Sequence, residues 1–364
     1  MKRICFLLLP LLWGCSFQSE NQIETIEIGD VSQCASSEPA FTSIDYVKLE
    51  TSSDALLADV AKVVVHKDRI YVLSMFDARV FIFSSSGEYI TSLRKGQGPG
   101  EVLFVSDMDI REDKLFVLDN YRYVRQYDLD GNYISDVYTS SSPRFSLKYV
   151  GDDLLLFDPY LDKSSDYLLH QIKDETDKGW LLKKKTMEKA NFLYYNFYSE
   201  GFISWPMCDT IYHYNAVSSQ VRPQYAVHFS GKSFYDIIDS ENYTNAMMCE
   251  INQDKSYYRW IQDVTPYESG VYFSFHYDKA YFVKYEQGKA TVYSEFADGL
   301  PPMITSAVGH AEDKMIYAFT AGELLEYKEK ALHEKAPDSR LVSLYESLSE
   351  DDNPVLFFVS LAKK

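Results

Sequence analysis

The densest group of residues with a chemical precedent is a glycine-rich stretch, LRKGQGPGEV, which spans Leu93–Val102. Glycine-rich loops bind phosphate when a helix follows directly, because the first turn of the helix points its free N–H groups at the anion. Here the strand-like segment VLFVSDMDI follows, and no G-K-[ST] signature is present. We therefore interpret the stretch as a structural crossing loop, in which glycine permits positive φ and proline fixes the backbone, at Gly96, Gly98, Pro99 and Gly100.

Histidine and acidic residues are the other groups with catalytic or metal-binding chemistry. The seven histidines show no metal-ligand spacing, and the sequence contains neither H-E-x-x-H nor G-x-S-x-G. Asp107, Asp109 and Asp119 allow a calcium site or a general acid–base pair, but aspartate also accepts bonds from backbone N–H groups in tight turns. We favour the turn role. The sequence therefore predicts no catalytic residues, no enzymatic activity and no cofactor, with calcium as the open alternative.

Aromatic side chains offer binding chemistry without catalysis. They make up 15% of the chain, and their flat apolar faces with polar rims suit sugars or peptides. Two segments supply candidate ligand-binding residues: Tyr194, Tyr195 and Trp205 in NFLYYNFYSEGFISW, and Arg259 and Trp260 in SYYRW. Alternating aromatics also pack well within and between sheets, so core packing is the competing interpretation of the first segment. The ligand that we expect is a protein partner or a glycan.

The N-terminus has the pattern of an export signal. Two basic residues precede an apolar run from Ile4 to Leu12, and Cys15 stands directly after a small residue. This order is typical of a secretory signal peptide that ends at residue 14, and the cysteine has the position of a bacterial lipobox cysteine. No later apolar run reaches the roughly 18 residues that a membrane span needs. We expect an exported chain that is lipid-anchored through Cys15, at the outer membrane.

Charge and cysteine content narrow the choice of partners. The chain has 36 Lys and Arg against 54 Asp and Glu, a net charge of −18. Nucleic-acid binding needs a basic patch, and the longest basic run, Lys183–Lys185, is isolated, so no nucleic-acid partner is expected. The cysteines beyond Cys15 match no zinc or redox motif, and their disulfide pairing is left open: Cys34, Cys208 and Cys249.

Internal repeats are the elements that must position these residues. The segments Arg69–Lys95 and Lys114–Thr139 align with each other, and Gly87 falls on Gly131, 44 residues later. Each unit has two β-rich runs, a polar turn that ends in glycine, and a third run. A period of about 40–50 residues built from short strands is typical of propeller blades. Four weaker copies follow and bring the total to six: Asp153–Phe157, Gly201–Trp205, Val271–Phe275 and Met315–Phe319.

These units predict an all-β fold, a six-bladed β-propeller. An N-terminal strand at Ile44–Leu49 is expected to close the ring, because closure removes exposed sheet edges. A long interval before the fifth unit indicates an insertion near Ser233–Pro266 with a short helix, and the sixth unit is expected to continue with a strand at Leu324–Tyr327. The predicted organisation is a signal peptide over residues 1–14, a lipidated tether over 15–40 and the propeller over 41–364.

The repeat resembles the NHL-type propeller repeat, in the segment IYVLSMFDARVFIFSSSGEYI followed by GQGPGEV, where Arg79 falls on the arginine of that repeat. The whole mature chain resembles the six-bladed β-propeller lipoproteins of Gram-negative gut anaerobes. Besides Gly96–Glu101, the matching segments are MCDTIY, YAVHF and EDDNPVL, at Met207–Tyr212, Tyr225–Phe229 and Glu350–Leu356. The resemblance implies an architecture and an address at the cell envelope, and no particular reaction.

Propellers support binding, catalysis and scaffolding alike, so the fold alone does not choose a function. We interpret the chain as a non-catalytic binding or interaction module at the cell envelope. The alternative is a propeller hydrolase or lactonase with a divalent cation in the channel, to which strand histidines such as His213 and His276 would contribute ligands from at least three blades. A purely structural envelope subunit would instead show a large apolar patch.

Overall fold

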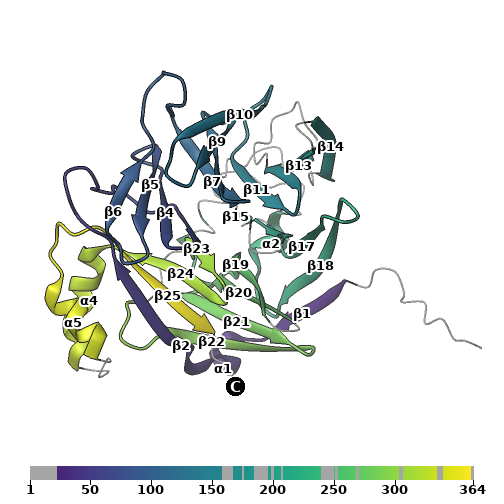
Figure 1. Cartoon of the computed structure of the whole chain (residues 1–364). Coiled ribbons are helices and arrows are strands. Elements are labelled where there is room, and N and C mark those ends of the chain that lie inside the picture. Colours follow the sequence, from purple (N-terminus) through teal and green to yellow (C-terminus); the bar gives the residue numbers. More distant parts are fainter. Residues whose placement is uncertain are drawn as a thin grey trace, which may run out of the picture.

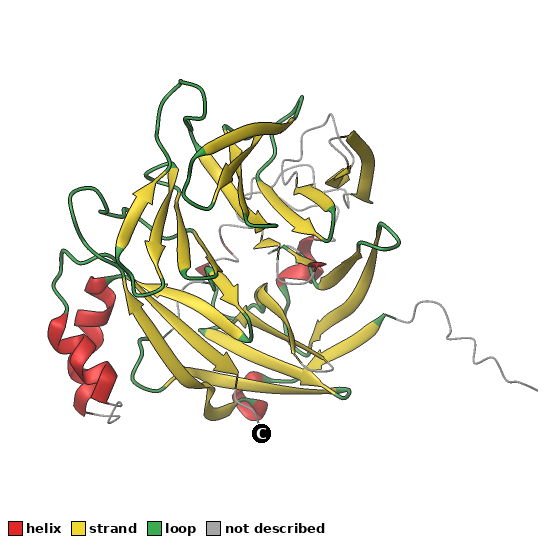
Figure 2. Ribbon diagram, in the orientation of Figure 1, coloured by secondary structure: helices red, strands yellow, loops and turns green. Residues whose placement is uncertain are grey.

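The strands of the computed structural model form small antiparallel sheets that follow one another around a ring (Figure 1). The fold is mostly β-strand, with a few helices at its periphery and between blades (Figure 2). The predicted six-bladed β-propeller is thereby confirmed. The structure describes residues 23–157, 167–173, 176–183, 196–197, 201–205, 208–238, 250, 253–267, 270–302, 306–333 and 339–361.

Blades 1 to 3 are regular four-stranded sheets, each made from four consecutive strands. Blade 1 contains β3 (Lys62–His66), β4 (Arg69–Ser74), β5 (Arg79–Ser84) and β6 (Tyr89–Ser92). Blade 2 contains β7 (Val105–Arg111), β8 (Lys114–Asp119), β9 (Tyr123–Asp128) and β10 (Tyr133–Thr139). Blade 3 contains β11 (Ser146–Val150), β12 (Asp153–Phe157), β13 (Tyr167–Lys173) and β14 (Thr176–Lys183). The first strands of neighbouring blades contact each other, which places them around the axis.

Blades 4 to 6 complete the ring with help from the N-terminal segment. Blade 4 contains β15 (Asn196–Phe197), β16 (Phe202–Ser204), β17 (Thr210–Asn215) and β18 (Gln220–Phe229). Blade 5 contains β19 (Arg259–Tyr267), β20 (Gly270–His276), β21 (Ala280–Glu286) and β22 (Lys289–Ala297). Blade 6 contains β23 (Gly309–Ala311), β24 (Lys314–Phe319), β25 (Val355–Leu361) and the N-terminal strand β2 (Ser36–Lys48).

The N-terminal segment runs along the outer edges of three blades. Strand β1 (Glu24–Ile28) pairs in parallel with β18 of blade 4. The first part of β2 pairs in parallel with β22 of blade 5, and its second part pairs antiparallel with β25 of blade 6. The strand that we expected at Ile44–Leu49 is therefore longer and begins at Ser36.

The expected tether over residues 15–40 needs correction, because its described part, from residue 23, forms β1, α1 (Val31–Cys34) and the start of β2. The segment ETIEI alternates polar and apolar residues, and Ile26 and Ile28 are almost completely buried. Such a period-two pattern covers a sheet edge well, although the composition of the segment is polar. Residues 15–22 lie outside the described residues.

Phe41 of β2 shows how this segment stabilises the ring. Its ring packs against Tyr272 and Phe282 of blade 5 and Tyr317 of blade 6, at centroid distances of 5.6, 5.9 and 5.9 Å. Tilted and edge-on aromatic contacts of this kind contribute about 0.5–1.5 kcal/mol each beyond their buried area. The high aromatic content thus serves packing between blades.

The helices lie in connections. Helix α1 (Val31–Cys34) joins β1 to β2, and α2 (Phe234–Ile238) lies in the insertion expected before blade 5. Helices α4 (Ala321–His333) and α5 (Ser339–Ser347) separate β24 from β25. No helix in the described ranges is long and apolar enough to span a membrane.

The strand expected at Leu324–Tyr327 is wrong, because these residues belong to α4. A capping box starts this helix: the Thr320 N–H donates to Glu323 Oε2 at 2.8 Å, and the Glu323 N–H donates to Thr320 Oγ1 at 3.2 Å. The segment that follows is rich in Ala, Leu, Glu and Lys, which are strong helix formers.

The order of strands gives the ring two faces. Connections between the second and third strands of a blade, and from the fourth strand to the next blade, lie on one face, which we call the crossing face. Turns between the first and second strands and between the third and fourth lie on the opposite turn face. Helices α2, α4 and α5 all fall in connections of the crossing face.

Candidate functional site

The crossing face of blade 1 exposes large apolar side chains. Phe76, between β4 and β5, is 82% exposed, and Leu56, between β2 and β3, is 58% exposed. Leu103, in the connection from β6 to β7, is 39% exposed. All three connections meet at the same end of the blade 1 sheet, where Lys62 pairs with Leu73 and Phe81 with Ser92. We call Leu56, Phe76 and Leu103 the apolar loop patch.

The backbone under this patch is held by aspartates. Asp59 accepts hydrogen bonds from the backbone N–H groups of Met75 (3.2 Å) and Phe76 (3.0 Å) and from the Ser74 hydroxyl (2.6 Å). Asp77 accepts from the Ala58 N–H at 3.0 Å and so ties the two loops together. A carboxylate that accepts several N–H bonds holds a tight loop in one conformation. The exposure of Phe76 is therefore a property of an ordered loop.

An aspartate of blade 2 holds the backbone at Leu103 in the same way. The buried carboxylate of Asp119 accepts from the N–H groups of Leu103 (2.8 Å) and Phe104 (2.9 Å). Beside them, the ring of Tyr121 lies 5.0 Å from Phe104 and 4.7 Å from Phe145, measured between centroids. These half-buried aromatics extend the apolar surface from blade 1 toward blade 3.

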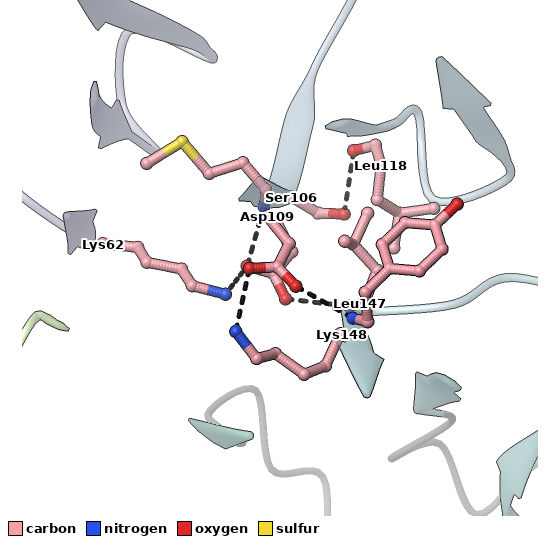
Figure 3. Close-up of polar contacts among 9 residues, drawn as sticks. Lys62, Ser106, Asp109, Leu118, Leu147 and Lys148 are labelled. Atoms are coloured by element: carbon pink, nitrogen blue, oxygen red, sulfur yellow. Dashed lines mark hydrogen bonds and ion pairs between the residues drawn. The ribbon is translucent and has the colours of Figure 1, made fainter. Parts of the chain in front are cut away.

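A second group of polar side chains lies at the axis, on the first strands of blades 1, 2 and 3. Figure 3 shows Lys62, Lys148 and Asp109 within this group. Lys62 Nζ donates to Asp107 Oδ1 at 2.7 Å, and Lys148 Nζ donates to Asp109 Oδ1 at 2.8 Å. The lysine side chains are 22% and 26% exposed, whereas both aspartates are buried.

The aspartates also join blade 2 to blade 3. Asp107 Oδ2 accepts from the Leu147 N–H, and Asp109 Oδ2 accepts from the Tyr149 N–H, each at 2.8 Å. Residues two apart in a strand lie on the same face, so two carboxylates of β7 meet two alternate N–H groups of β11. The turn role expected for Asp107 and Asp109 is therefore wrong: both lie within strand β7 and accept backbone N–H groups from the edge strand of the next blade.

The opposite wall of the axis carries His310 of β23 and Thr265 of β19. His310 Nε2 lies 2.9 Å from Thr265 Oγ1. Burial, together with the positive charges of Lys148 and Lys62, lowers the pKa of His310 to about 4. The imidazole is therefore neutral at pH 7.

Blade 5 adds a further histidine and a buried acid. His276 Nε2 lies 3.3 Å from Gln262 Nε2, and burial with the charge of Arg259 lowers the pKa of His276 to about 4. Asp263, which is fully buried, accepts from the Ser274 hydroxyl at 2.7 Å and from the Ala307 N–H at 2.8 Å. Burial raises the pKa of Asp263 to about 6 against these bonds.

The structure places the ligand-binding residues expected from composition in different environments. Tyr194 and Tyr195 lie outside the described residues. Trp205 is buried and stacks on Tyr212 at 5.6 Å, so it packs in the core as the competing interpretation predicted. This placement corrects the expectation that Trp205 presents a face to a ligand.

The second pair, Arg259 and Trp260, is also engaged within the chain. Arg259 is buried, and its guanidinium donates to the carbonyl oxygens of Asp254 and Tyr257, each at 3.0 Å. Trp260 is half-buried, adopts φ = 57°, and packs edge-on to His276 at 5.2 Å. Both residues lie on the first strand of blade 5 rather than on an exposed loop, and their role in binding stays a prediction.

The glycine-rich stretch connects β6 to β7 and carries no anion-binding helix. Glu101 Oε2 accepts from the Gly98 N–H at 2.8 Å, and a Cβ on Gly96 would lie 2.0 Å from the same oxygen. Gly100 adopts φ = +75° against the side chain of Tyr133. The glycines are needed because this loop folds back on its own glutamate. Nearby, the guanidinium of Arg79 lies 4.5 Å from the centre of the Phe81 ring.

The described residues bear on the metal-site alternative and on two of the cysteines. Across the described ranges, no three His, Cys, Asp or Glu side chains come together as a metal site would require. His213 packs edge-on to Phe202 at 5.1 Å. Cys34 is an exposed free thiol, Cys208 is buried, and Cys15 and Cys249 lie outside the described residues.

The ring of blades, with its ordered loops and axial ion pairs, is that of a six-bladed β-propeller. Residues 23–360 match the model of a family described as a domain of unknown function, DUF4934, and the chain belongs to this family.

One solved structure is similar in fold, and a second matches more weakly. A putative exported protein from Bacteroides fragilis superposes with a TM-score of 0.73 at 17% identity, over 93% of this chain and 100% of that chain. A member of the DUF4221 family from Bacteroides vulgatus reaches a TM-score of 0.47 at 11% identity, over 89% of this chain and 99% of that chain. No curated protein sequence matches this chain significantly.

Proposed function

We propose that this chain is a non-catalytic interaction module of the cell envelope, exported and lipid-anchored through Cys15, and that it binds a protein partner through the apolar loop patch. One observation carries the proposal: Phe76 is 82% exposed on a loop whose backbone is fixed by Asp59. Exposed apolar groups that lie together mark interaction sites. A loop that is ordered before binding loses little conformational entropy when the partner arrives.

The chemistry of the patch favours a protein over a glycan. Leu56, Phe76 and Leu103 carry no hydrogen-bonding groups in their side chains, whereas sugar hydroxyls require donors and acceptors. Aromatic side chains at the centre of an interface commonly contribute most of its binding energy. Phe76 is the best placed aromatic for this role.

The direction of β1 supports an orientation for the proposed anchor. Strand β18 leads from the turn face to the crossing face, and β1 pairs with it in parallel, so that Ile28 meets Phe229 at the crossing end. The N-terminal end of β1 is consequently directed away from the crossing face. An anchor at Cys15 would leave the apolar loop patch turned away from the membrane and open to a partner.

The test compares two exposed apolar residues on opposite faces. Val217, in the turn between β17 and β18, is 99% exposed on the turn face and serves as the control. The chain from residue 16 onward is immobilised as wild type, Phe76→Ala and Val217→Ala, and exposed to solubilised envelope from the producing organism. The wild type and Val217→Ala are expected to retain the same protein, and Phe76→Ala to lose it.

Affinity measured with the purified partner makes the test quantitative. Phe76→Ala should weaken binding by at least about tenfold, as expected for a central aromatic, while its thermal midpoint stays near that of the wild type because the side chain is exposed. Equal affinity for wild type and Phe76→Ala would exclude the patch as the binding site. If the wild type retained no protein at all, the interaction function itself would be contradicted.

The anchor has a separate test. Cys15→Ser should abolish incorporation of a clickable palmitate analogue during growth and release the chain from the membrane fraction. Unchanged labelling of the variant would refute lipidation at Cys15 and leave the partner experiment unaffected.

A further inference from the structure

The ammonium groups of Lys62 and Lys148 have unused hydrogen-bonding capacity at the axis. An ammonium group has three N–H donors. In the described part of the chain, the hydrogen bond to Asp107 is the one made by Lys62 Nζ, and the bond to Asp109 is the one made by Lys148 Nζ. Both side chains keep roughly a quarter of their surface exposed. A side chain that solvent reaches in part is also within reach of a ligand.

The aspartates hold these lysines in place without competing for a ligand. Each carboxylate already accepts a backbone N–H on its second oxygen, from Leu147 and Tyr149 respectively. Because these bonds tie blade 2 to blade 3, the carboxylates cannot swing away to follow a mobile lysine. The two ammonium groups are therefore positioned by the scaffold before any ligand binds, which lowers the entropic cost of binding.

The other wall presents polar groups without charge. His310 Nε2 and Thr265 Oγ1 lie 2.9 Å apart. Burial, with the positive charges of Lys148 and Lys62, lowers the pKa of His310 to about 4, so the imidazole is neutral at pH 7. The charged donors with spare N–H groups at this point of the axis are therefore the two lysines, and such donors bind an acceptor.

The charge balance limits the charge of such an acceptor. Two ammonium groups and two carboxylates sum to zero, so the axis can accommodate one added negative charge better than two, because a buried charge without compensation is costly. We propose that this point of the axis binds the carboxylate group of a small organic acid, with Lys62 and Lys148 as charged donors and Thr265 and His310 as neutral partners. This inference is independent of the apolar loop patch.

The experiment uses matched pairs of ligands. Isothermal titration of the chain from residue 16 onward compares D-glucuronate with D-glucose, and N-acetylglycine with its primary amide, so that only the carboxylate differs within each pair. Binding of at least one acid without its neutral counterpart is expected. The pair that binds distinguishes a sugar acid from a peptide-like carboxylate. Absence of binding by both acids up to about 10 mM, or binding of inorganic phosphate alone, would overturn the proposal.

Variants assign the binding to the axial lysines. Lys148→Met should weaken the acid by about tenfold or more, since a charged hydrogen bond is lost. Because this variant leaves Asp109 without its partner, the double variant Lys148→Met/Asp109→Asn removes both charges together and should lose binding equally. Lys279→Met, at a surface pair with Glu295 at 3.1 Å, is the control and should bind as wild type. Wild-type affinity in a folded double variant would refute the site.

Discussion

Asn353 holds the loop that carries Leu56: its side-chain Oδ1 accepts a hydrogen bond from the Leu57 N–H at 2.9 Å. The Nδ2 group of the same side chain donates to the carbonyl oxygen of Glu50 at 2.7 Å and to that of Ala55. Asn353 is 1% exposed. A residue of the EDDNPVL segment, near the end of the chain, thus organises the first connection of the propeller.

Replacement of Asn353 by alanine should destabilise the fold by about 2–4 kcal/mol, because the buried N–H and carbonyl groups of the loop lose their partner. We expect a fall of the thermal midpoint by several degrees. Asn353→Asp should also destabilise, since its second oxygen would face two carbonyl oxygens. The control is Asn215→Ala, an exposed turn residue whose Oδ1 accepts from the Ser218 N–H at 2.9 Å. Equal shifts in the two alanine variants would contradict this account.

Two glycines with the same backbone angle separate conformational strain from steric conflict. Gly100 adopts φ = +75° and Gly288 adopts φ = +76°. A Cβ on Gly100 would lie 2.4 Å from the Cβ of Tyr133, whereas a Cβ on Gly288 would meet nothing within 4 Å. Gly288→Ala should cost about 1 kcal/mol from the left-handed conformation, and Gly100→Ala about 1–3 kcal/mol more from overpacking. Urea unfolding measures both, and equal losses would argue against the clash.

The blades were predictable from the sequence because their second and third strands repeat with a constant period. The first strands were harder to recognise, since strands such as β7 and β23 carry charged or small residues that bond across the axis instead of an alternating pattern. The helical pair α4–α5 was readable in principle from the capping box at Thr320 and Glu323, but a short apolar run at Leu324 was interpreted as a strand.

The candidate sites were not predictable in the same way. Phe76 is exposed because Asp59 fixes its loop, and nothing in the local residues distinguishes this phenylalanine from a buried one. Lys62 meets Asp107, and Lys148 meets Asp109, only because the ring brings the first strands of blades 1, 2 and 3 to one axis. The composition instead pointed to aromatic clusters as binding sites, but Trp205 of one cluster is buried in the core.

The capping box predicts a local effect on α4. Thr320→Ala should cost about 1 kcal/mol, because the hydroxyl that accepts the Glu323 N–H is lost, whereas Thr320→Ser should retain most of the stability. Ser343→Ala in the middle of α5 is the control, since its hydroxyl bonds only the Ser339 carbonyl at 3.0 Å and alanine is the better helix former. Hydrogen exchange of the α4 amides should be faster in Thr320→Ala alone. Unchanged exchange in this variant would show that the capping box does not stabilise α4.

Stability should depend on pH through groups that act in opposite directions. The pKa of His276 and of His310 is about 4 in the folded chain, below the usual 6.5. Between pH 4 and 6.5 the unfolded chain binds more protons at these residues, so their contribution to the free energy of unfolding rises with pH and is lost on acidification. Asp263 behaves oppositely: its folded pKa of about 6 exceeds the usual 3.8, so its contribution falls as pH rises through this window.

Single replacements should therefore tilt the pH profile in opposite senses. His310→Gln removes one of the terms that rise with pH, so unfolding free energies from urea titrations between pH 4 and 6.5 should rise less steeply than in the wild type. Asp263→Asn removes the opposing term, so its profile should rise more steeply. Comparing each variant with the wild type cancels the surface carboxylates, which both share. Parallel profiles for all three proteins would mean that neither group changes its proton affinity on folding, because linkage requires a slope wherever the folded and unfolded pKa differ.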